Sequence, residues 1–525
     1  MAGATQRWPR ATDSPSLPDP AFSYAGRVRL RLPLLAAVLA SLIVVSAAQA
    51  KSTTVRKSQG TITTTRGADG VRHLKFRWGP IAIKPGQNTI SLADNQLLPP
   101  GPGWITSFKP DLTYVNGKVP RVDVIHLHHA VWVVTGPANG LRPTWAAGEE
   151  KTIFRTPKGF GWRYRASDHW LLNHMIHNLT AVPTKVYITW DMDYIPLGVR
   201  AARGMQEVKT QWLDVEGLKA YPVFDAVQGS GVNGQFTYPD DKPDAYAGIA
   251  PRNQWVVDHD ATLVGTAGHL HPGGLWTDLK LTRDGRTVEV FRSRAKYFEP
   301  AGAVSWDVAM TATPPTWKVA VKKGDVLSVS GTYDTRTTSW YEVMAIMPVA
   351  ITNVPAGGAD PFVTNTAVPG VLTHGHLAEN NHHGGAPGRD LSDARALPDG
   401  PRTPTVDISQ FIYRQGDLTG AGSVGRPPVV SVGQPLTFVN DDASRNIFHT
   451  ITACRAPCTA TTGIAFPLAN GPVAFDSGEL GYGPVGFTAA ANRKQWQTPG
   501  DLGAGTYTYF CRIHPFMRGA FRVKG

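Results

Sequence analysis

The sequence predicts an all-β protein built from several β-sandwich lobes. Its 54 glycines and 42 prolines in 525 residues are typical of a chain with many short strands and turns. Segments of alternating apolar and polar residues, such as 185–190 and 326–331, are separated by Gly, Pro, Asn and Asp turns. Long helical periodicity is absent, and the chain is too long for one hydrophobic core.

The first 50 residues are predicted to be a signal peptide with an extended, disordered n-region. A basic stretch at 27–31 precedes an apolar run at 32–48, and Ala48-Gln-Ala50 is a small-x-small cleavage signal. The run is short for a membrane span, which needs about 20 apolar residues. The protein is therefore expected to be secreted or extracytoplasmic, in the cell envelope. The alternative is an uncleaved membrane anchor through 32–48.

The remaining chain is predicted to form three β domains and one linker. A first lobe spans 51–200, a second lobe spans 201–354, a linker rich in His, Gly and Pro spans 355–404, and a C-terminal domain spans 405–525. The formal charge of +12 predicts a weak attraction to anionic surfaces. Because no dense basic run carries interleaved aromatics, no nucleic acid partner is expected.

Candidate metal ligands are concentrated near the C-terminus. Cys511, His514 and Met517 lie within seven residues, and His449 lies upstream in an apolar run. Two His, a Cys thiolate and a weak axial Met form the trigonal site that suits blue copper. A zinc site is one alternative, although zinc rarely takes Met, and a buried Cys with a core Met is another.

This motif resembles a known ligand loop. Cys511-x-x-His514-x-x-Met517 resembles the short copper loop of amicyanin within the cupredoxin family, and His449 matches that family's upstream ligand. The resemblance covers residues 405–525. It implies a Greek-key β-sandwich that holds a type 1 (blue) copper and transfers electrons.

The other two cysteines, Cys454 and Cys458, are close in sequence. In an oxidising compartment they would close a small disulfide loop. Two free thiols or a further pair of metal ligands are the alternatives.

The first lobe contains an adjacent histidine pair, His128 and His129, followed by His177. Adjacent residues of a strand point to opposite faces, so a bulge or strand end is needed for both to reach one ion. His177 is the expected third ligand and His174 the alternative. Clustered imidazoles are costly to bury without a ligand or partner, which favours a metal site.

The second lobe contains His269 and His271, which lie two apart and share one face of a strand. Met344, or alternatively Met347, would add a thioether ligand that favours copper.

These two clusters resemble those of the copper type II, ascorbate-dependent monooxygenases, the family of the peptidylglycine and dopamine hydroxylases. The resemblance implies two jelly-roll lobes, with one copper at His128, His129 and His177 and another at His269, His271 and Met344. The segment 268–274 also resembles the plant stress-upregulated nodulin family. The family's substrate-carboxylate clamp is replaced here by Ala267 and Pro348, so a peptide-glycine substrate is not expected.

The leading hypothesis is an exported multicopper oxidoreductase that uses O2 to hydroxylate a small organic substrate. The blue copper would feed electrons to the lobes, and a redox partner or small reductant would supply them. The alternative is an electron carrier whose lobes bind copper or a ligand without turnover.

Overall fold

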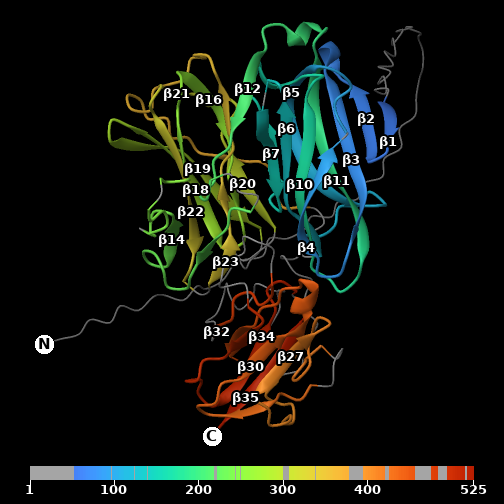
Figure 1. The fold of residues 1–525 in the computed structure, drawn as a ribbon, viewed down its shortest axis with the longest axis vertical. Helices are drawn as coiled ribbons and strands as arrows, with labels where there is room; N and C mark the ends of the chain where they lie inside the picture. The colour runs from blue at the N-terminus through green and yellow to red at the C-terminus, as the bar shows by residue number, and fades with distance from the viewer. Residues whose placement is uncertain are drawn as a thin grey trace, which may run out of the picture. The chain divides into compact units, whose positions relative to one another are not determined.

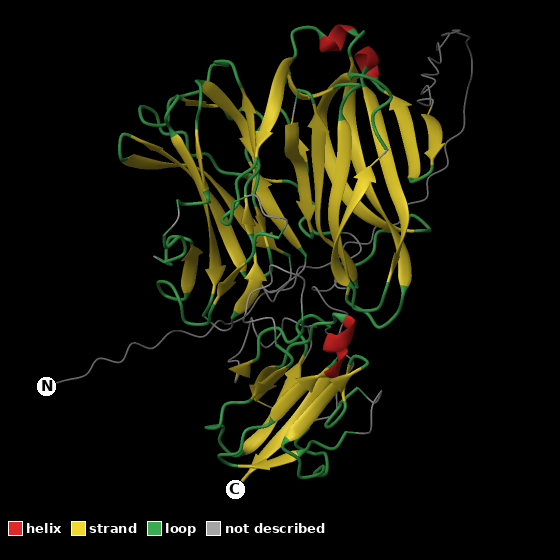
Figure 2. Ribbon diagram, viewed as in Figure 1, coloured by secondary structure: helices red, strands yellow, loops and turns green. Residues whose placement is uncertain are grey.

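Strands account for nearly all of the regular structure, as the sequence predicts (Figure 2). The computed structural model describes residues 52–525 apart from 96, 123, 139, 218–220, 243, 249, 299–306, 337–338, 378–393, 420–424, 456–474, 483–492 and 515–516. The predicted signal peptide, Cys458 and the Cys454 side chain lie outside the described residues. Within the described part of the chain, no helix is long and apolar enough to cross a membrane.

The first lobe contributes seven strands to a long sheet and forms a second sheet of four strands (Figure 1). Its strands are β1 (Ser52–Lys57), β2 (Gly60–Arg66), β3 (Arg72–Ile83), β4 (Asn88–Asn95), β5 (Gly103–Tyr114), β6 (Ile125–Gly136), β7 (Gly140–Gly148), β8 (Phe154–Arg155), β9 (Phe160–Tyr164), β10 (His169–Asn178) and β11 (Thr184–Pro196). The short 3-10 turns η1 (Ala68–Gly70) and η2 (Arg200–Ala202) lie in loops.

The second half of the described chain continues in short strands. Those before the C-terminal domain are β12 (Gln206–Gln211), β13 (Phe224–Ala226), β14 (Gln235–Tyr238), β15 (Gln254–Val256), β16 (Ala261–Thr266), β17 (His269–Leu270), β18 (Gly274–Arg283), β19 (Arg286–Tyr297), β20 (Val308–Ala312), β21 (Val319–Val321), β22 (Val326–Asp334), β23 (Trp340–Val343), β24 (Ala345–Ile346), β25 (Val349–Thr352) and β26 (Val371–Leu372). Those of the C-terminal domain are β27 (Thr405–Ser409), β28 (Ile412–Tyr413), β29 (Val429–Ser431), β30 (Thr437–Asn440), β31 (Thr452–Arg455), β32 (Phe475–Asp476), β33 (Gln495–Gln497), β34 (Gly505–Phe510) and β35 (Arg518–Lys524), with the 3-10 turn η3 (Asp441–Arg445).

Alternation of side chains explains why these segments form strands. In β11, the side chains of Val186, Ile188, Trp190 and Met192 are fully buried, and the residues between them are mostly polar. A strand that places every second side chain in a core hides apolar area on one face. The same period of two organises the strands that carry the candidate ligands.

The three largest hydrophobic cores of the described residues follow one another along the chain. The first is built mainly from residues between 62 and 208, the second from residues between 213 and 351, and the third from residues between 406 and 523. A few residues cross between them: Phe510 packs into the second core, and Leu179 of the first lobe packs into the third. The C-terminal domain is therefore anchored to both lobes by apolar contacts.

One sheet joins the first and second lobes. Strand β12 pairs in parallel with β9 of the first lobe and antiparallel with β25 of the second lobe. The resulting eleven-stranded sheet runs β1-β2-β3-β11-β5-β9-β12-β25-β16-β21, with β8 paired to β5. The two lobes thus share backbone hydrogen bonds as well as side-chain contacts.

The described part of the predicted linker contacts the lobes. Strand β26 pairs with β20, the His374 ring donates a hydrogen bond to the backbone oxygen of Glu150, and His376 forms an ion-pair contact with Asp307. This segment therefore lies against the lobes, with His374 next to Glu150.

Candidate metal centres

Strand pairing brings the C-terminal ligands together. Cys511 directly follows β34, and a turn leads from Cys511 to β35, which pairs with β34. His449 lies three residues before β31, and β31 pairs with β34 so that Thr452 lies opposite Phe510. Ligands separated by about sixty positions therefore meet at one end of the sheet.

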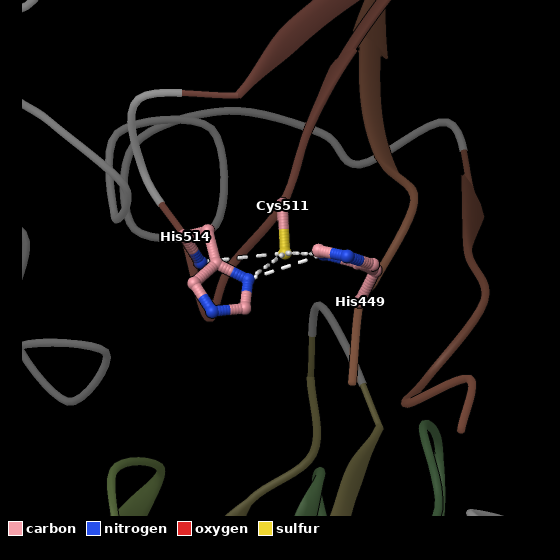
Figure 3. A group of neighbouring side chains, drawn as sticks. All are labelled: His449, Cys511 and His514. Atoms are coloured by element: carbon pink, nitrogen blue, oxygen red, sulfur yellow. Dashed lines mark hydrogen bonds between the residues drawn. The ribbon is translucent and has the colours of Figure 1, made fainter. Parts of the chain in front are cut away.

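The ligand atoms of His449, Cys511 and His514 all lie within 4.8 Å of one another (Figure 3). The Cys511 Sγ lies 3.9 Å from Nδ1 of His449 and 3.7 Å from Nδ1 of His514. The two Nδ1 atoms are 3.1 Å apart. All three side chains are fully buried. One ion bound among these atoms would meet two imidazoles and one sulfur, so the residues fit a trigonal copper site.

The surroundings of Cys511 favour its thiolate form. The backbone N–H groups of Thr450 and His514 each donate a hydrogen bond to Sγ at 3.3 Å. Burial would raise the pKa of the Cys511 thiol, but interaction with His449 and these two donors outweighs burial and lowers it. Since thiolate is the form that binds metal, the site is prepared for an ion.

A carboxylate that the sequence analysis missed orients His449. Oδ2 of Asp442 lies 3.0 Å from Nε2 of His449, so Nε2–H donates and Nδ1 faces Cys511. Asp442 is held in turn by backbone N–H donors of Gln410 and Phe411 and by Arg445. Burial would lower the pKa of His449, but the hydrogen bond to Asp442 and the contact with Cys511 raise it. Such a carboxylate fixes the tautomer and strengthens the ligand.

Met517 closes the turn that carries the ligands. Its backbone N–H donates to the His514 carbonyl at 2.9 Å, and the Cys511 N–H donates to the Met517 carbonyl at 3.4 Å. The Met517 side chain is 1% exposed and packs in the same core as Cys511. Its role as axial ligand stays a prediction.

In the first lobe, a bulge in β6 reorganises the histidines. Met175 of β10 lies opposite His129, and the next residue, Ile176, lies opposite Leu127, so His128 is the extra residue. The His128 ring centroid lies 6.0 Å from that of His129 and 6.1 Å from that of His177. The three residues predicted for one site are therefore neighbours.

His126, which the sequence analysis did not consider, belongs to the same group. Its ring centroid lies 5.2 Å from that of His177 and 5.8 Å from that of His128. The sequence contained a signal for this contact, because residues two apart on a strand, such as His126 and His128, point to the same face. His174, the alternative third ligand, instead packs its ring edge-on against Trp78 at 5.1 Å.

The second-lobe pair meets the first-lobe histidines. The ring centroids of His269 and His271 are 5.3 Å apart, and those of His271 and His128 are only 4.6 Å apart. Imidazoles that share one tetrahedral ion have centroids about 5 Å apart, because each nitrogen lies about 2 Å from the ion. The two predicted ligand sets therefore form one cluster, here called the interlobe histidine cluster: His126, His128, His129, His177, His269 and His271.

Several ring nitrogens of this cluster lack a hydrogen-bond partner among the described residues. They are Nδ1 of His128 and Nε2 of His129, His269 and His271. Burial lowers the pKa of His129 to about 3, and that of His126 to about 4. These two rings are therefore neutral at pH 7, which is the form of histidine that binds a metal.

Two buried carboxyl groups adjoin the cluster, and the sequence analysis missed both. Glu150 Oε2 lies 3.0 Å from Nδ1 of His269, and Glu150 Oε1 accepts the Gly148 N–H at 3.0 Å. This contact leaves Nε2 of His269 available to a metal. Neither carboxylate oxygen of Glu149 has a hydrogen-bond partner among the described residues, and burial raises its pKa to about 8.

The structure separates the two candidate methionines. Met344 lines a cavity together with His129 and His269, whereas Met347 is fully buried in the second-lobe core. The geometry therefore favours Met344 as the thioether beside the cluster. Coordination by Met344 stays a prediction.

The two centres are neighbours. The ring centroid of His177 lies 6.3 Å from that of His514, with the rings edge to face. The centroid of His514 lies 4.9 Å from that of His449. Imidazole rings therefore follow one another from the C-terminal site to the interlobe histidine cluster.

Comparison with solved structures finds copper proteins and vicilins. A Cu(I) form of an amicyanin variant shares 22% identity, covers 26% of this chain and 91% of its own length, and has a TM-score of 0.15. A Cu-containing nitrite reductase from Thermus scotoductus shares 15% identity, covers 51% of this chain and 59% of its own, and has a TM-score of 0.15. Vicilin from hazelnut, Corylus avellana, shares 7% identity over 57% of this chain and 83% of its own, with a TM-score of 0.13.

No protein-family model and no curated protein matches the chain. TM-scores of 0.15 and below carry no argument about function.

Proposed function

We propose that the protein is a copper oxidoreductase in which a C-terminal blue-copper centre passes electrons to copper held by the interlobe histidine cluster. The observation that carries this proposal is the 6.3 Å approach of the His177 and His514 rings. It gives the C-terminal site a direct neighbour among buried imidazoles, as an electron relay requires.

At the C-terminal centre, His449, Cys511 and His514 would hold the ion and Met517 would be the axial ligand. Burial and the two N–H donors on Cys511 Sγ keep these ligands in fixed positions. Ligands that stay in place when the copper changes oxidation state keep the reorganisation energy of electron transfer low. A bound copper would supply one-electron redox chemistry at both centres and reactivity with O2 at the second.

We divide the interlobe histidine cluster into two copper sites, each with ligands from both lobes. The short distance between His128 and His271 favours one site with His177 as a third ligand. His129 and His269 line one cavity with Met344, which favours a second site there. This grouping differs from the lobe-by-lobe sets implied by the monooxygenase resemblance.

The proposed reaction is hydroxylation of an organic substrate. R–H, O2, two electrons and two protons give R–OH and water. An external reductant supplies the electrons one at a time through the C-terminal centre. Glu150 would orient His269, and the buried setting of the cluster would exclude bulk water from the reacting atoms.

The test follows reoxidation of the blue copper. Protein loaded with copper is reduced, mixed with O2 and monitored by blue absorption, with non-blue copper quantified by electron paramagnetic resonance. We expect His271→Ala to keep the blue centre, lose one equivalent of non-blue copper and slow reoxidation by about tenfold or more, whereas His259→Ala, a half-buried histidine outside the cluster, should match the wild type. Blue copper alone in the wild type, with no O2 consumed, would instead identify an electron carrier.

A further inference from the structure

We infer that the cavity beside His129, His269 and Met344 binds an uncharged aromatic molecule about the size of two fused rings, with one hydrogen-bond donor. This inference rests on the proposed function, because it names the class of substrate that the second centre would act on.

The cavity lies where the two lobes meet. Its volume is about 240 Å³, and its walls come from β6 and β7 of the first lobe and from residues near β12, β17 and β24. A cavity of about 150 Å³ in another protein holds benzene, so this one has room for a larger ring system. His129, His269 and Met344 form part of its wall, which places a bound molecule beside the proposed copper ligands.

Most of the wall is aromatic or aliphatic. Phe108, Trp145, Phe154, Trp162 and Trp212 all line the cavity. The Trp145 ring stacks on Phe108 at 5.5 Å and meets Trp162 edge-on at 5.7 Å, so these rings hold one another in place. Rigid aromatic walls favour flat apolar ligands by burial and by ring contacts.

The charge of the wall excludes an anionic ligand. No lysine or arginine occurs among the described residues that line the cavity. Its one carboxylate, Glu150, is already engaged by His269 and by the Gly148 N–H. In the metal-free protein, a ligand carboxylate would lose its hydration without gaining a lysine or arginine partner, which is costly. The ligand is therefore uncharged.

Two residues that line the cavity each have a buried oxygen that could accept a hydrogen bond from a ligand. Asn173 Oδ1 and Thr152 Oγ1 are buried and have no hydrogen-bond partner among the described residues. A buried acceptor left unpaired costs free energy, so a ligand O–H or N–H placed there is favoured. A phenol or an indole has this combination of flat apolar surface and one donor.

The experiment compares 2-naphthol with 2-naphthoate by isothermal titration calorimetry on the full chain, first without metal. We expect 2-naphthol to bind at least about tenfold more tightly than the anion. Val133→Trp fills the cavity and should weaken 2-naphthol binding by about tenfold or more, whereas Val115→Trp at an exposed position should not. If Val133→Trp lowers the melting temperature, Ala146→Leu replaces it as a variant that fills the cavity with a smaller side chain and should also weaken binding.

Equal or tighter binding of the anion, or unchanged binding in both filled variants, would overturn the inference. The proposed function is tested separately on copper-loaded protein, where 2-naphthol should alter the electron paramagnetic resonance spectrum of non-blue copper. Binding of 2-naphthol by a protein that takes up only blue copper would uphold the cavity assignment and refute the proposed function. Uptake of non-blue copper without 2-naphthol binding would support the proposed function and refute the cavity assignment.

Discussion

His128 of the first lobe lies closer to His271 of the second lobe than to the neighbouring rings of its own lobe. The centroids are 4.6 Å apart across the lobes, against 5.8 Å to His126, 6.0 Å to His129 and 6.1 Å to His177. A ligand set that includes this pair requires both lobes at once, so neither lobe alone would carry it.

A pair of alanine substitutions distinguishes shared from separate sites. If His128 and His271 hold one ion, His128→Ala, His271→Ala and the double variant should each lose the same single equivalent of non-blue copper. If each histidine belongs to its own lobe's site, the double variant should lose two equivalents. Copper content by atomic absorption on dialysed protein decides between them, with His259→Ala as the control.

Asp442→Asn should raise the reduction potential of the blue centre. The Asp442 carboxylate, bound to Nε2 of His449, stabilises the more positive oxidised ion, and the amide removes that charge. We expect a rise of roughly 50–100 mV by spectroelectrochemistry, since 59 mV is a tenfold change for one electron. Asp441→Asn, an exposed neighbour in η3, is the matched control and should change the potential little. A potential equal to the wild type in Asp442→Asn would remove Asp442 from this role.

Met517→Gln should keep the blue colour and lower the potential, because a harder axial ligand favours Cu(II). Cys511→Ser should abolish the intense charge-transfer absorption, since the thiolate is its source. Visible spectra and voltammetry check both. Persistent blue absorption in Cys511→Ser, or an unchanged potential in Met517→Gln, would contradict the corresponding ligand assignment.

Glu150→Gln should weaken copper binding at the interlobe histidine cluster by about 10- to 100-fold. The carboxylate fixes Nδ1 of His269 and raises the electron density of the ring. Competition with a chelator measures the affinity, and the blue centre should be unaffected. Glu207→Gln, which removes a half-buried carboxylate paired with Arg165, is the control.

Glu149→Gln should change how the stability of the metal-free protein depends on pH. Burial raises the pKa of Glu149 from 4.5 to about 8, so the folded state favours the neutral acid. Its contribution to stability is therefore complete below pH 4.5 and is lost as the pH rises toward 8. The variant should melt about 2–4 °C above the wild type at pH 8.5 and match it more closely at pH 5. Identical pH profiles would show that Glu149 does not titrate in this way.

Local motifs made much of the C-terminal site predictable. Cys511, His514 and Met517 belong to one turn, so their proximity follows from sequence spacing, and the structure brings His449 beside Cys511 and His514. Asp442 was missed because an acidic residue near a turn is common and carries no signal of its contact with His449. That metals occupy these sites stays a prediction.

The all-β class was predicted correctly because strand periodicity and turn residues are local properties. The contact of His128 with His271 was not predicted, because no pattern within either lobe specifies which of its faces meets the other. Glu150 was missed for the same reason: its partner His269 is 119 positions away. His126 could have been found, since it shares a strand face with His128.

The shared strand β12 also determines how a molecule can reach the cavity. Hinging the lobes apart would break the backbone hydrogen bonds of β12 with either β9 or β25. Those hydrogen bonds resist separation of the two lobes. The distances between the imidazoles of the two lobes are therefore set by the fold and not by closure around a ligand. The cavity therefore keeps nearly the same width when a ligand enters, and this width limits the size of the ligand.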